Sequence, residues 1–190
     1  MVQRITEFIA TRHVGSKFES SSRGAASAWR GFSLQTLYIA SRIANAAETD
    51  SEYYPESVED LLVINHPDSD DASLELVQVK SSTQGLALSD LDVTSSQCFF
   101  RIAEDAWSRG IDATLTLVVF GRLGDELGRY GMGDDGAVSS IGAKLLGKGY
   151  SRKTCERIHD SLRIFHPDEE GLKDELRQTI SKIVPAMAAP

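Results

Sequence analysis

Two runs rich in Leu, Val and Ile, residues 60–65 and 74–80, place the tightest constraint on how this chain folds. A polar, proline-containing turn separates them, and this pattern predicts a β-hairpin. Because side chains alternate along a strand, Gln78 and Lys80 share one face of the second strand. The antiparallel return brings Asp60, at the start of the first strand, beside them. The hairpin therefore predicts a carboxylate, an amide oxygen and an ammonium together at one edge of a sheet.

This set of groups suits a Mg²⁺ site, with Mn²⁺ as the alternative ion, because such cations prefer hard oxygen ligands and keep several waters. Asp60 would supply a charged oxygen, Gln78 a neutral one and the backbone carbonyl of Val79 a third. Lys80 would lie beside a water on the ion, favour its hydroxide form and direct it at a phosphodiester. The alternative is an ordinary polar strand end, since short motifs of this kind recur by chance.

Length and composition predict one soluble domain. The chain has 190 residues, 41% of them hydrophobic and 25% charged, which are ordinary globular values. It holds neither an apolar run of the roughly 20 residues that a membrane span needs nor an N-terminal signal-peptide core. Its two cysteines are too few for a disulfide framework or a cysteine metal cluster. We therefore expect a cytoplasmic protein without a membrane partner.

The charge is unevenly distributed. A net charge of −8 argues against a general nucleic-acid binder, yet residues 144–163 are rich in Lys and Arg. Clustered cations matter more at a phosphate backbone than the net figure does. We expect contacts to a DNA backbone from that region and from the hydroxyl-rich loop after Lys80, namely from Lys148, Arg152, Lys153, Ser81 and Ser82. The alternative for the basic run is a solvated helix face.

A long helix is expected over residues 23–47, before the hairpin. Apolar residues recur there at helical spacing and predict its buried stripe. Gln35 lies at the edge of that stripe, where a polar amide needs a partner. It would either bond to a neighbouring loop or contact the metal site. The stripe consists of Ala25, Trp29, Phe32, Ile39 or Ala40, Ile43 and Ala47.

Alternating helices and strands are expected around and after the hairpin. The expected elements are an edge strand from Tyr53 to Val58, a loop over 81–85, a helix over 89–109, a strand over 113–120, a loop over 121–136, helices over 137–146 and 151–160, a strand over 162–165 and a last helix from Pro167 that ends before Pro185.

This order is similar to the αβββαβ core of restriction-endonuclease-like folds, an α/β architecture with a central mixed sheet flanked by helices. Three segments also resemble the double-stranded-DNA endonuclease domain at the N-terminus of bacterial antiphage effectors, both CBASS effectors that sense cyclic oligonucleotides and STAND-type NTPase sensors. The segments are Arg30-Gly-Phe-Ser-Leu-Gln35, Ser57-Val-Glu-Asp60 and Leu76-Val-Gln-Val-Lys-Ser81. The resemblance is good over residues 24–85 and is limited to element order elsewhere.

The resemblance implies a PD-(D/E)XK nuclease in which Asp60 and Gln78 bind the metal and Lys80 is the catalytic lysine. Gln35 would hold the helix position that often carries a glutamate in these enzymes. Glu56 or Glu59 would be a further acid near the metal. A neutral Gln78 departs from the commoner acidic residue and removes one charge from the metal site.

The implied activity is Mg²⁺-dependent cleavage of double-stranded DNA with low sequence specificity, in the effector domain of an antiphage system that oligomerisation activates. Cutting both strands needs two active sites, so a homo-oligomer is expected. Residues 1–23 would form a lead-in, 24–184 the nuclease-like domain and 185–190 the start of a linker to a C-terminal sensor or NTPase domain. The alternative is a non-catalytic nucleic-acid-binding or interaction module on the same fold.

Overall fold

The computed structural model describes residues 4, 5, 7, 8, 25–46, 50–56 and 58–187. Among these residues, five strands form one mixed sheet in the order β1-β2-β3-β4-β5. β1, β2 and β3 pair antiparallel, whereas β3, β4 and β5 run parallel. The strands are β1 (Ser51–Pro55), β2 (Leu61–Asn65), β3 (Ser73–Leu86), β4 (Asp112–Leu123) and β5 (Leu162–Phe165).

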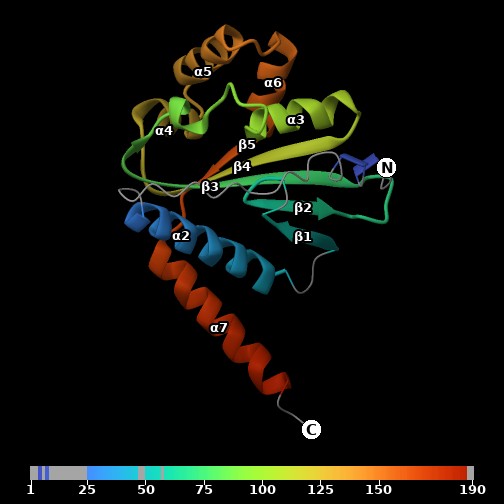
Figure 1. The fold of residues 1–190 in the computed structure, drawn as a ribbon, viewed down its shortest axis with the longest axis vertical. Coiled ribbons are helices and arrows are strands. Elements are labelled where there is room, and N and C mark those ends of the chain that lie inside the picture. The colour runs from blue at the N-terminus through green and yellow to red at the C-terminus, as the bar shows by residue number, and fades with distance from the viewer. Residues whose placement is uncertain (1–3, 6, 9–24, 47–49, 57, 188–190) are drawn as a thin grey trace.

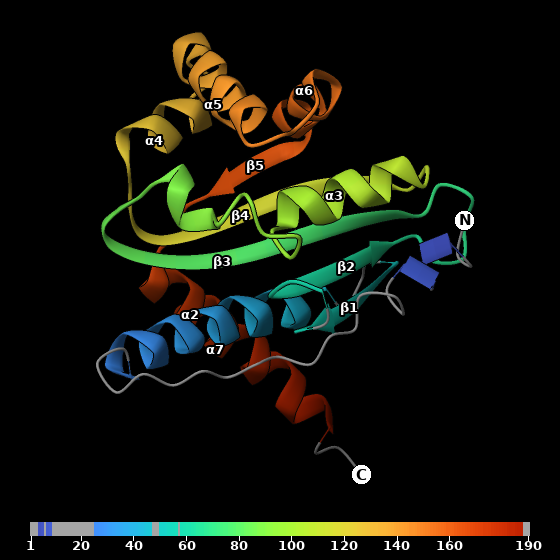
Figure 2. The same cartoon turned by 45° about the horizontal axis from the view of Figure 1, so that its top comes forward.

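Helices cover both faces of the sheet (Figures 1 and 2). Parallel strands need crossover connections, and the helices of the two crossovers, α3 and α4 to α6, lie on one face. α2 and α7 lie on the other. The expected mixed sheet flanked by helices is therefore confirmed. The helices are α2 (Ala25–Ala44), the short 3₁₀ helix η1 (Leu88–Leu91), α3 (Phe99–Ser108), α4 (Asp125–Gly131), α5 (Asp135–Gly147), α6 (Arg152–Ser161) and α7 (Glu169–Met187).

Alternation along the strands produces two separate cores. Leu62 and Leu76 point toward α3 and belong to the larger core, which also buries Ile5 and Phe8 from the predicted lead-in. The rest of that lead-in lies outside the described residues. On the other face, strand residues such as Val77 pack against α2 and α7. Both faces are covered, which explains why the central strands are almost continuously apolar.

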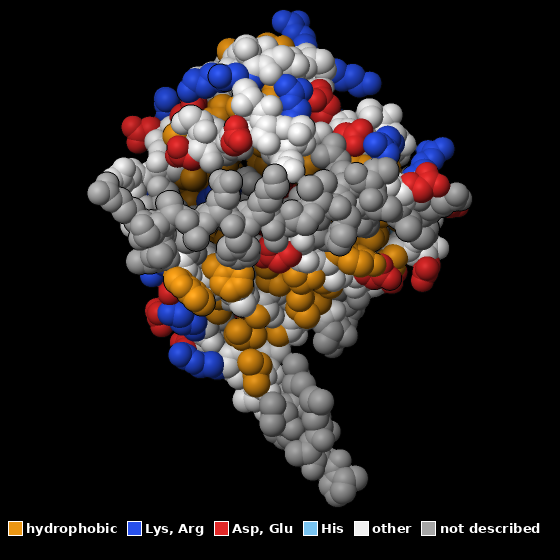
Figure 3. All heavy atoms as spheres, viewed as in Figure 1, with side chains coloured by type: hydrophobic (Ala, Val, Ile, Leu, Met, Phe, Trp, Pro, Cys, Tyr) orange, Lys and Arg blue, Asp and Glu red, His pale blue; other side chains and the backbone are white. Residues whose placement is uncertain are grey.

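The predicted buried stripe of α2 is confirmed only at Ile39, which is 8% exposed. Trp29, Phe32 and Ile43 are 69%, 46% and 43% exposed, so the prediction is wrong for these three residues. The helix instead turns Leu34 and Tyr38, four residues apart and on one face of the helix, toward the sheet. Figure 3 shows hydrophobic side chains gathered over α2 and the adjoining part of α7.

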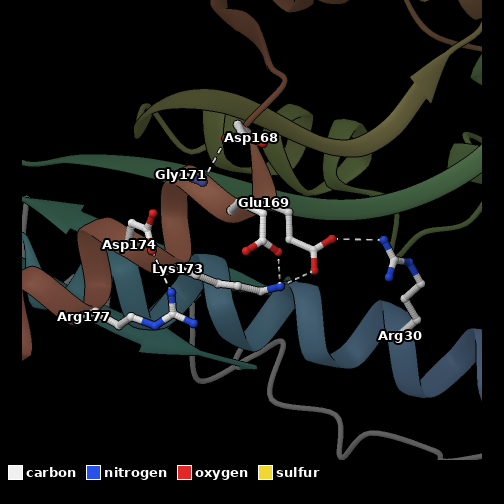
Figure 4. Close-up of polar contacts among 8 residues, drawn as sticks. Arg30, Asp168, Glu169, Gly171, Lys173, Asp174 and Arg177 are labelled. Atoms are coloured by element: carbon white, nitrogen blue, oxygen red, sulfur yellow. Dashed lines mark hydrogen bonds and ion pairs between the residues drawn. The ribbon is translucent and has the colours of Figure 1, made fainter.

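Polar contacts join α2 to α7 (Figure 4). Arg30 pairs with Glu169 at 3.0 Å, and Lys173 pairs with the same carboxylate at 2.8 Å. The hydrogen bond from Lys173 is the main cause that lowers the pKa of Glu169, and Arg30 adds to it. Thr179 of α7 donates a hydrogen bond to Asn45, the residue that follows α2, at 3.0 Å. These contacts hold α7 beside α2.

The remaining elements agree with expectation in part. The strands over 113–120 and 162–165 and the helices over 137–146 and 151–160 are present. The helix expected from Ser89 starts only at Phe99, because the chain turns at Asp92 with φ 45°. The loop expected over 121–136 contains α4, and α7 continues through Pro185 to Met187. No helix in the described ranges has both the length and the apolar character to cross a bilayer.

Candidate functional site

Asp60 is fixed at the point where β2 begins. Leu61 pairs with Val77, so one further step of the same register sets Asp60 opposite Gln78. The Oδ2 atom of Asp60 accepts a hydrogen bond from the backbone N–H of Val79 at 2.5 Å. Lys80 shares the face of Gln78 by strand alternation, and its charge acts on the Asp60 carboxylate. The structure thus brings Asp60, Gln78 and Lys80 together.

Gln78 is a buried polar residue whose amide oxygen is unsatisfied within the described part of the chain. It lies on β3, on the sheet face that α3 covers, and is only 8% exposed. Its Nε2 donates to Oε2 of Glu59 at 3.3 Å. Its Oε1 is buried and has no hydrogen-bond partner among the described residues. An unsatisfied buried oxygen typically costs about 1–3 kcal/mol, so its retention requires an explanation.

The carboxylates of Asp60 and Glu56 both have a raised pKa. Burial raises the pKa of Asp60, although the Val79 amide and the Lys80 charge act against that rise. The pKa of Glu56 is raised as well, first by burial and then by the negative charge of Asp60. Such raised values mean that a nearby positive charge would stabilise both ionised groups.

Gln35 reaches this acidic region from α2. Its Nε2 donates a short hydrogen bond to Oε1 of Glu56. Glu56 lies just after β1 and has φ 54°, a left-handed backbone conformation that is uncommon outside glycine. The structure therefore confirms that Gln35 contacts a neighbouring loop residue, and its contact with a metal site stays a prediction. Ser57, between Glu56 and Val58, lies outside the described residues.

The donor set fits a hard divalent cation that takes few protein ligands. Among the described residues, no three His, Cys, Asp or Glu side chains cluster closely enough to hold a metal. The predicted ligands include only one such group, Asp60, and the other two are the Gln78 amide and the Val79 carbonyl. The buried Oε1 of Gln78 is a neutral oxygen of the kind that Mg²⁺ accepts beside waters.

The predicted DNA-backbone residues lie at two places. Lys148, Arg152 and Lys153 are exposed around the junction of α5 and α6. Arg101 of α3 ties this junction down by donating to the Lys148 carbonyl at 2.8 Å. The junction therefore lies on the α3 side of the sheet, the side that Gln78 faces.

Ser81 and Ser82, the two serines that follow Lys80, differ in exposure. Ser81 is exposed, and Ser82 is half-buried. Ser82 accepts a hydrogen bond from the backbone N–H of Gly85 at 3.1 Å. These residues lie on β3 rather than in the predicted loop, because β3 continues to Leu86 in pairing with β4.

Sequence reasoning missed the backbone N–H of Val79 as the group that orients Asp60. Only the strand register reveals it, and no residue type carries a signal for it.

Comparisons with known proteins return no matching family model and no matching curated protein. Three solved structures are similar to this chain. One is a Cap4 SAVED/CARF-domain containing receptor of Moraxella osloensis, at 16% identity and TM-score 0.49 over 80% of this chain and 37% of that chain. Another is the Acinetobacter baumannii Cap4 receptor with the cyclic trinucleotide 3'3'3'-cAAA, at 13% identity and TM-score 0.47 over 80% and 35%. The same receptor with 2'3'3'-cAAA gives 12% identity and TM-score 0.47 over 88% and 36%. The chain thus spans little more than a third of the length of these receptors.

Proposed function

We propose that this chain is a metal-dependent endonuclease that hydrolyses double-stranded DNA. The observation that carries the proposal is the buried Oε1 of Gln78, which lies beside Asp60, on the face of Lys80, and has no hydrogen-bond partner in the part of the chain that the structure describes. A cation held by Asp60, Gln78 and the Val79 carbonyl would satisfy that oxygen. It would also stabilise the carboxylate whose pKa burial raises.

When bound, Mg²⁺ or Mn²⁺ would polarise the phosphodiester and acidify a water. The chain's own residues supply the rest. The Val79 N–H holds the Asp60 carboxylate in one orientation. The Glu59 carboxylate accepts a hydrogen bond from the amide nitrogen of Gln78. This contact orients the Gln78 amide and leaves the Oε1 atom of Gln78 available to bind the cation.

Lys80 supplies positive charge where the reaction develops negative charge. In hydrolysis the water oxygen bonds to phosphorus, the bond to one bridging oxygen breaks, and the leaving oxygen takes up a proton. The ammonium of the half-buried Lys80 would stabilise the charge that builds on the phosphate oxygens and would hydrogen-bond the attacking water. Lys80 is therefore assigned as the catalytic lysine.

Glu56 is assigned as the further acid. Burial and the negative charge of Asp60 raise its pKa, which favours uptake of a proton from water. Gln35 positions it through the hydrogen bond to Oε1. The carboxylate of Glu59 is instead engaged by Gln78, so its role is to hold that amide.

The duplex would contact Lys148, Arg152 and Lys153 through its backbone, with Ser81 and Ser82 nearer the cut. Both strands are cut when two copies act together, so the active form is a homo-oligomer. On the sequence resemblance, we assign the chain to the effector part of a cytoplasmic antiphage system, with a C-terminal sensor or NTPase domain as the regulator.

The test uses supercoiled plasmid and Mg²⁺ with the chain fused to a dimerising coiled coil. We expect wild type to nick and linearise the plasmid, and EDTA to abolish both. Lys80→Ala should lose at least about 100-fold in rate, the usual scale for a catalytic proton-transfer or charge-stabilising group. Lys182→Ala, an exposed lysine on α7, is the matched control and should cut normally. Equal rates for wild type and Lys80→Ala would refute the proposal.

A non-catalytic nucleic-acid-binding or interaction module is the second candidate. The neutral Gln78 and the lack of a three-residue acidic cluster among the described residues favour it. Calorimetric titration with Mn²⁺ distinguishes the two candidates, because the nuclease requires binding that Asp60→Asn removes. The module predicts identical heats for both proteins.

A further inference from the structure

β3 extends well beyond its partner β2. The backbone pairing of the two strands ends at Val77, and the Asp60 side chain takes the next N–H on that edge. β3 continues to Leu86 along β4. Residues 81–86 of β3 and 120–123 of β4 are here called the ribbon tip (Figures 1 and 2). No described strand pairs with the β2-facing edge of the ribbon tip.

The ribbon tip contains a bulge. Ser82 pairs with Gly121 and Leu86 pairs with Leu123, so residues 83–85 stand opposite the single residue Arg122. Bulges are enriched beside active sites, where they redirect side chains. This one begins three residues after Lys80.

The bulge has a fixed conformation. Gly121 has φ 100°, and a Cβ there would lie 2.2 Å from the Ser82 carbonyl oxygen, so only glycine fits. Gly85 has φ 111° and donates its N–H to the Ser82 hydroxyl at 3.1 Å. The His166 ring makes a short hydrogen bond to the Gly121 carbonyl. The side chains on the bulge are therefore presented in one arrangement.

Three polar side chains project from the bulge. Thr83, Gln84 and Arg122 are all exposed. Arg122 makes no ion pair with any described residue. A hydroxyl, a carboxamide and a guanidinium are the groups with which proteins contact DNA phosphates and base edges.

The spacing suits a duplex whose scissile phosphate lies at Lys80. Four strand residues span at most about 13 Å from Lys80 to Gln84. The rise of B-DNA is about 3.4 Å per base pair, so the bulge lies within about four base pairs of the cut.

We propose that the ribbon tip contacts the DNA groove next to the cleavage site. Thr83 and Gln84 determine sequence context there, and Arg122 binds a phosphate. This inference rests on the proposed nuclease function and adds to it a determinant of substrate preference.

Binding is measured first, in the Lys80→Ala background so that the DNA stays intact. The probe is a fluorescent 30-base-pair duplex, titrated at several salt concentrations. Adding Thr83→Ala and Gln84→Ala together should weaken binding about tenfold, as expected for two lost polar contacts. Adding Arg122→Ala should lower the slope of log K against log salt by about 1. Adding Arg177→Ala, the loss of an exposed arginine on α7, is the matched control and should change neither quantity.

Cleavage is measured second, with Lys80 intact, by sequencing the ends of plasmid products. Thr83→Ala/Gln84→Ala should still cut but lose the base preference around the cut that wild type shows. If Thr83→Ala/Gln84→Ala leaves both the duplex affinity and the cleavage pattern unchanged, the inference about the ribbon tip is overturned and the nuclease proposal stands. Duplex binding without any wild-type cleavage would overturn the nuclease proposal alone, because the binding measurements still decide the role of the ribbon tip. If none of the proteins tested binds the duplex, both the nuclease proposal and the inference about the ribbon tip are overturned.

Discussion

The carboxylate of Asp60 accepts the backbone N–H of Val79 at 2.5 Å, which extends the β2–β3 contact one step past the last paired residues. A side chain here takes the position that a backbone carbonyl would hold in a longer strand. The bond orients a charged group at the place where β3 loses its partner. Asp60 thus contributes to the sheet, and under the proposed function it would also bind the metal. Its mutation should therefore have separable effects on stability and on metal binding.

Asp60→Asn should stabilise the metal-free protein at neutral pH. Burial raises the pKa of Asp60 above its ordinary value of 3.8, so the folded state binds this proton more tightly than the unfolded state does. Stability is therefore lost as pH rises from that ordinary value through the raised one. Asparagine removes the cost of ionisation and keeps an oxygen for the Val79 N–H.

Thermal unfolding in EDTA checks this expectation. Asp60→Asn should melt about 2–4 °C above wild type near pH 7, which corresponds to about 1 kcal/mol, and the difference should shrink toward pH 4. Added Mn²⁺ should raise the melting temperature of wild type only. A less stable Asp60→Asn near pH 7 in EDTA would show that the ionised carboxylate is net favourable without metal.

Gln78→Glu should tighten metal binding and weaken the metal-free fold. The change adds a charge at a site that is 8% exposed and next to the Glu59 carboxylate, so it costs stability in EDTA. Mn²⁺ would offset that charge. Calorimetry should show Mn²⁺ binding at least about tenfold tighter, since one added ligand charge acts at short range. Unchanged affinity would remove Gln78 from the ligand set.

Gln35→Leu should shift the pH dependence of cleavage. The Gln35 amide donates a hydrogen bond to Glu56, whose pKa is raised by burial and by the charge of Asp60. A hydrogen bond to a carboxylate favours its ionised form, so we expect loss of the Gln35 amide to raise the Glu56 pKa further. The acidic limb of the rate profile should move to higher pH while the plateau at high pH changes less. Thr36→Ala, one position along on the exposed face of α2, is the control. A uniform loss of rate at every pH would indicate a purely structural role for Gln35.

The hairpin and the predicted site trio could be derived from sequence because both depend on local alternation. The period of two along β3 sets Gln78 and Lys80 on one face regardless of the rest of the fold. The buried face of α2 could not be derived in this way. Trp29 and Phe32 are large and apolar, yet Leu34 and Tyr38 face the sheet, because contacts with the sheet and not helical spacing alone decide which side of the helix is buried.

The bulge was also beyond sequence reasoning. A run of Ser, Thr, Gln and Gly is typical of loops, and only its pairing with β4 shows that residues 81–86 extend a strand. The left-handed turn at Asp92, which delays α3 until Phe99, gave no clear signal either, since aspartate is common in the first turn of helices. Both features depend on contacts between segments distant in sequence.

Arg42→Met should destabilise the fold by removing the partner of a half-buried carboxylate. Arg42 donates to Glu75 at 2.8 Å, and Thr116 donates to the same side chain at 2.7 Å, on the sheet face covered by α2. Loss of the Arg42 guanidinium leaves the Glu75 carboxylate with the Thr116 hydroxyl as its one side-chain donor among the described residues. We expect a loss of about 1–3 kcal/mol in urea unfolding.

The double variant Arg42→Met/Glu75→Leu is the matched control for that measurement. It removes both charges and should recover most of the lost stability, because replacing a whole pair is far less costly than breaking it. Additive losses in the double variant would show that the two side chains contribute independently.

Gly121→Ala should cost more stability than any other glycine change in the described strands, because of its backbone contact. A methyl group at this position would lie 2.2 Å from the Ser82 carbonyl oxygen, and φ 100° is unfavourable for alanine. Relief requires the ribbon tip to open, so we expect a loss of about 2 kcal/mol or more in urea unfolding. Gly142→Ala on α5 is the control, since nothing lies within 4 Å of its Cβ position and alanine favours helix by about 1 kcal/mol. If both variants behave alike, the bulge is not held by Gly121, and the fixed presentation of Thr83 and Gln84 loses its basis.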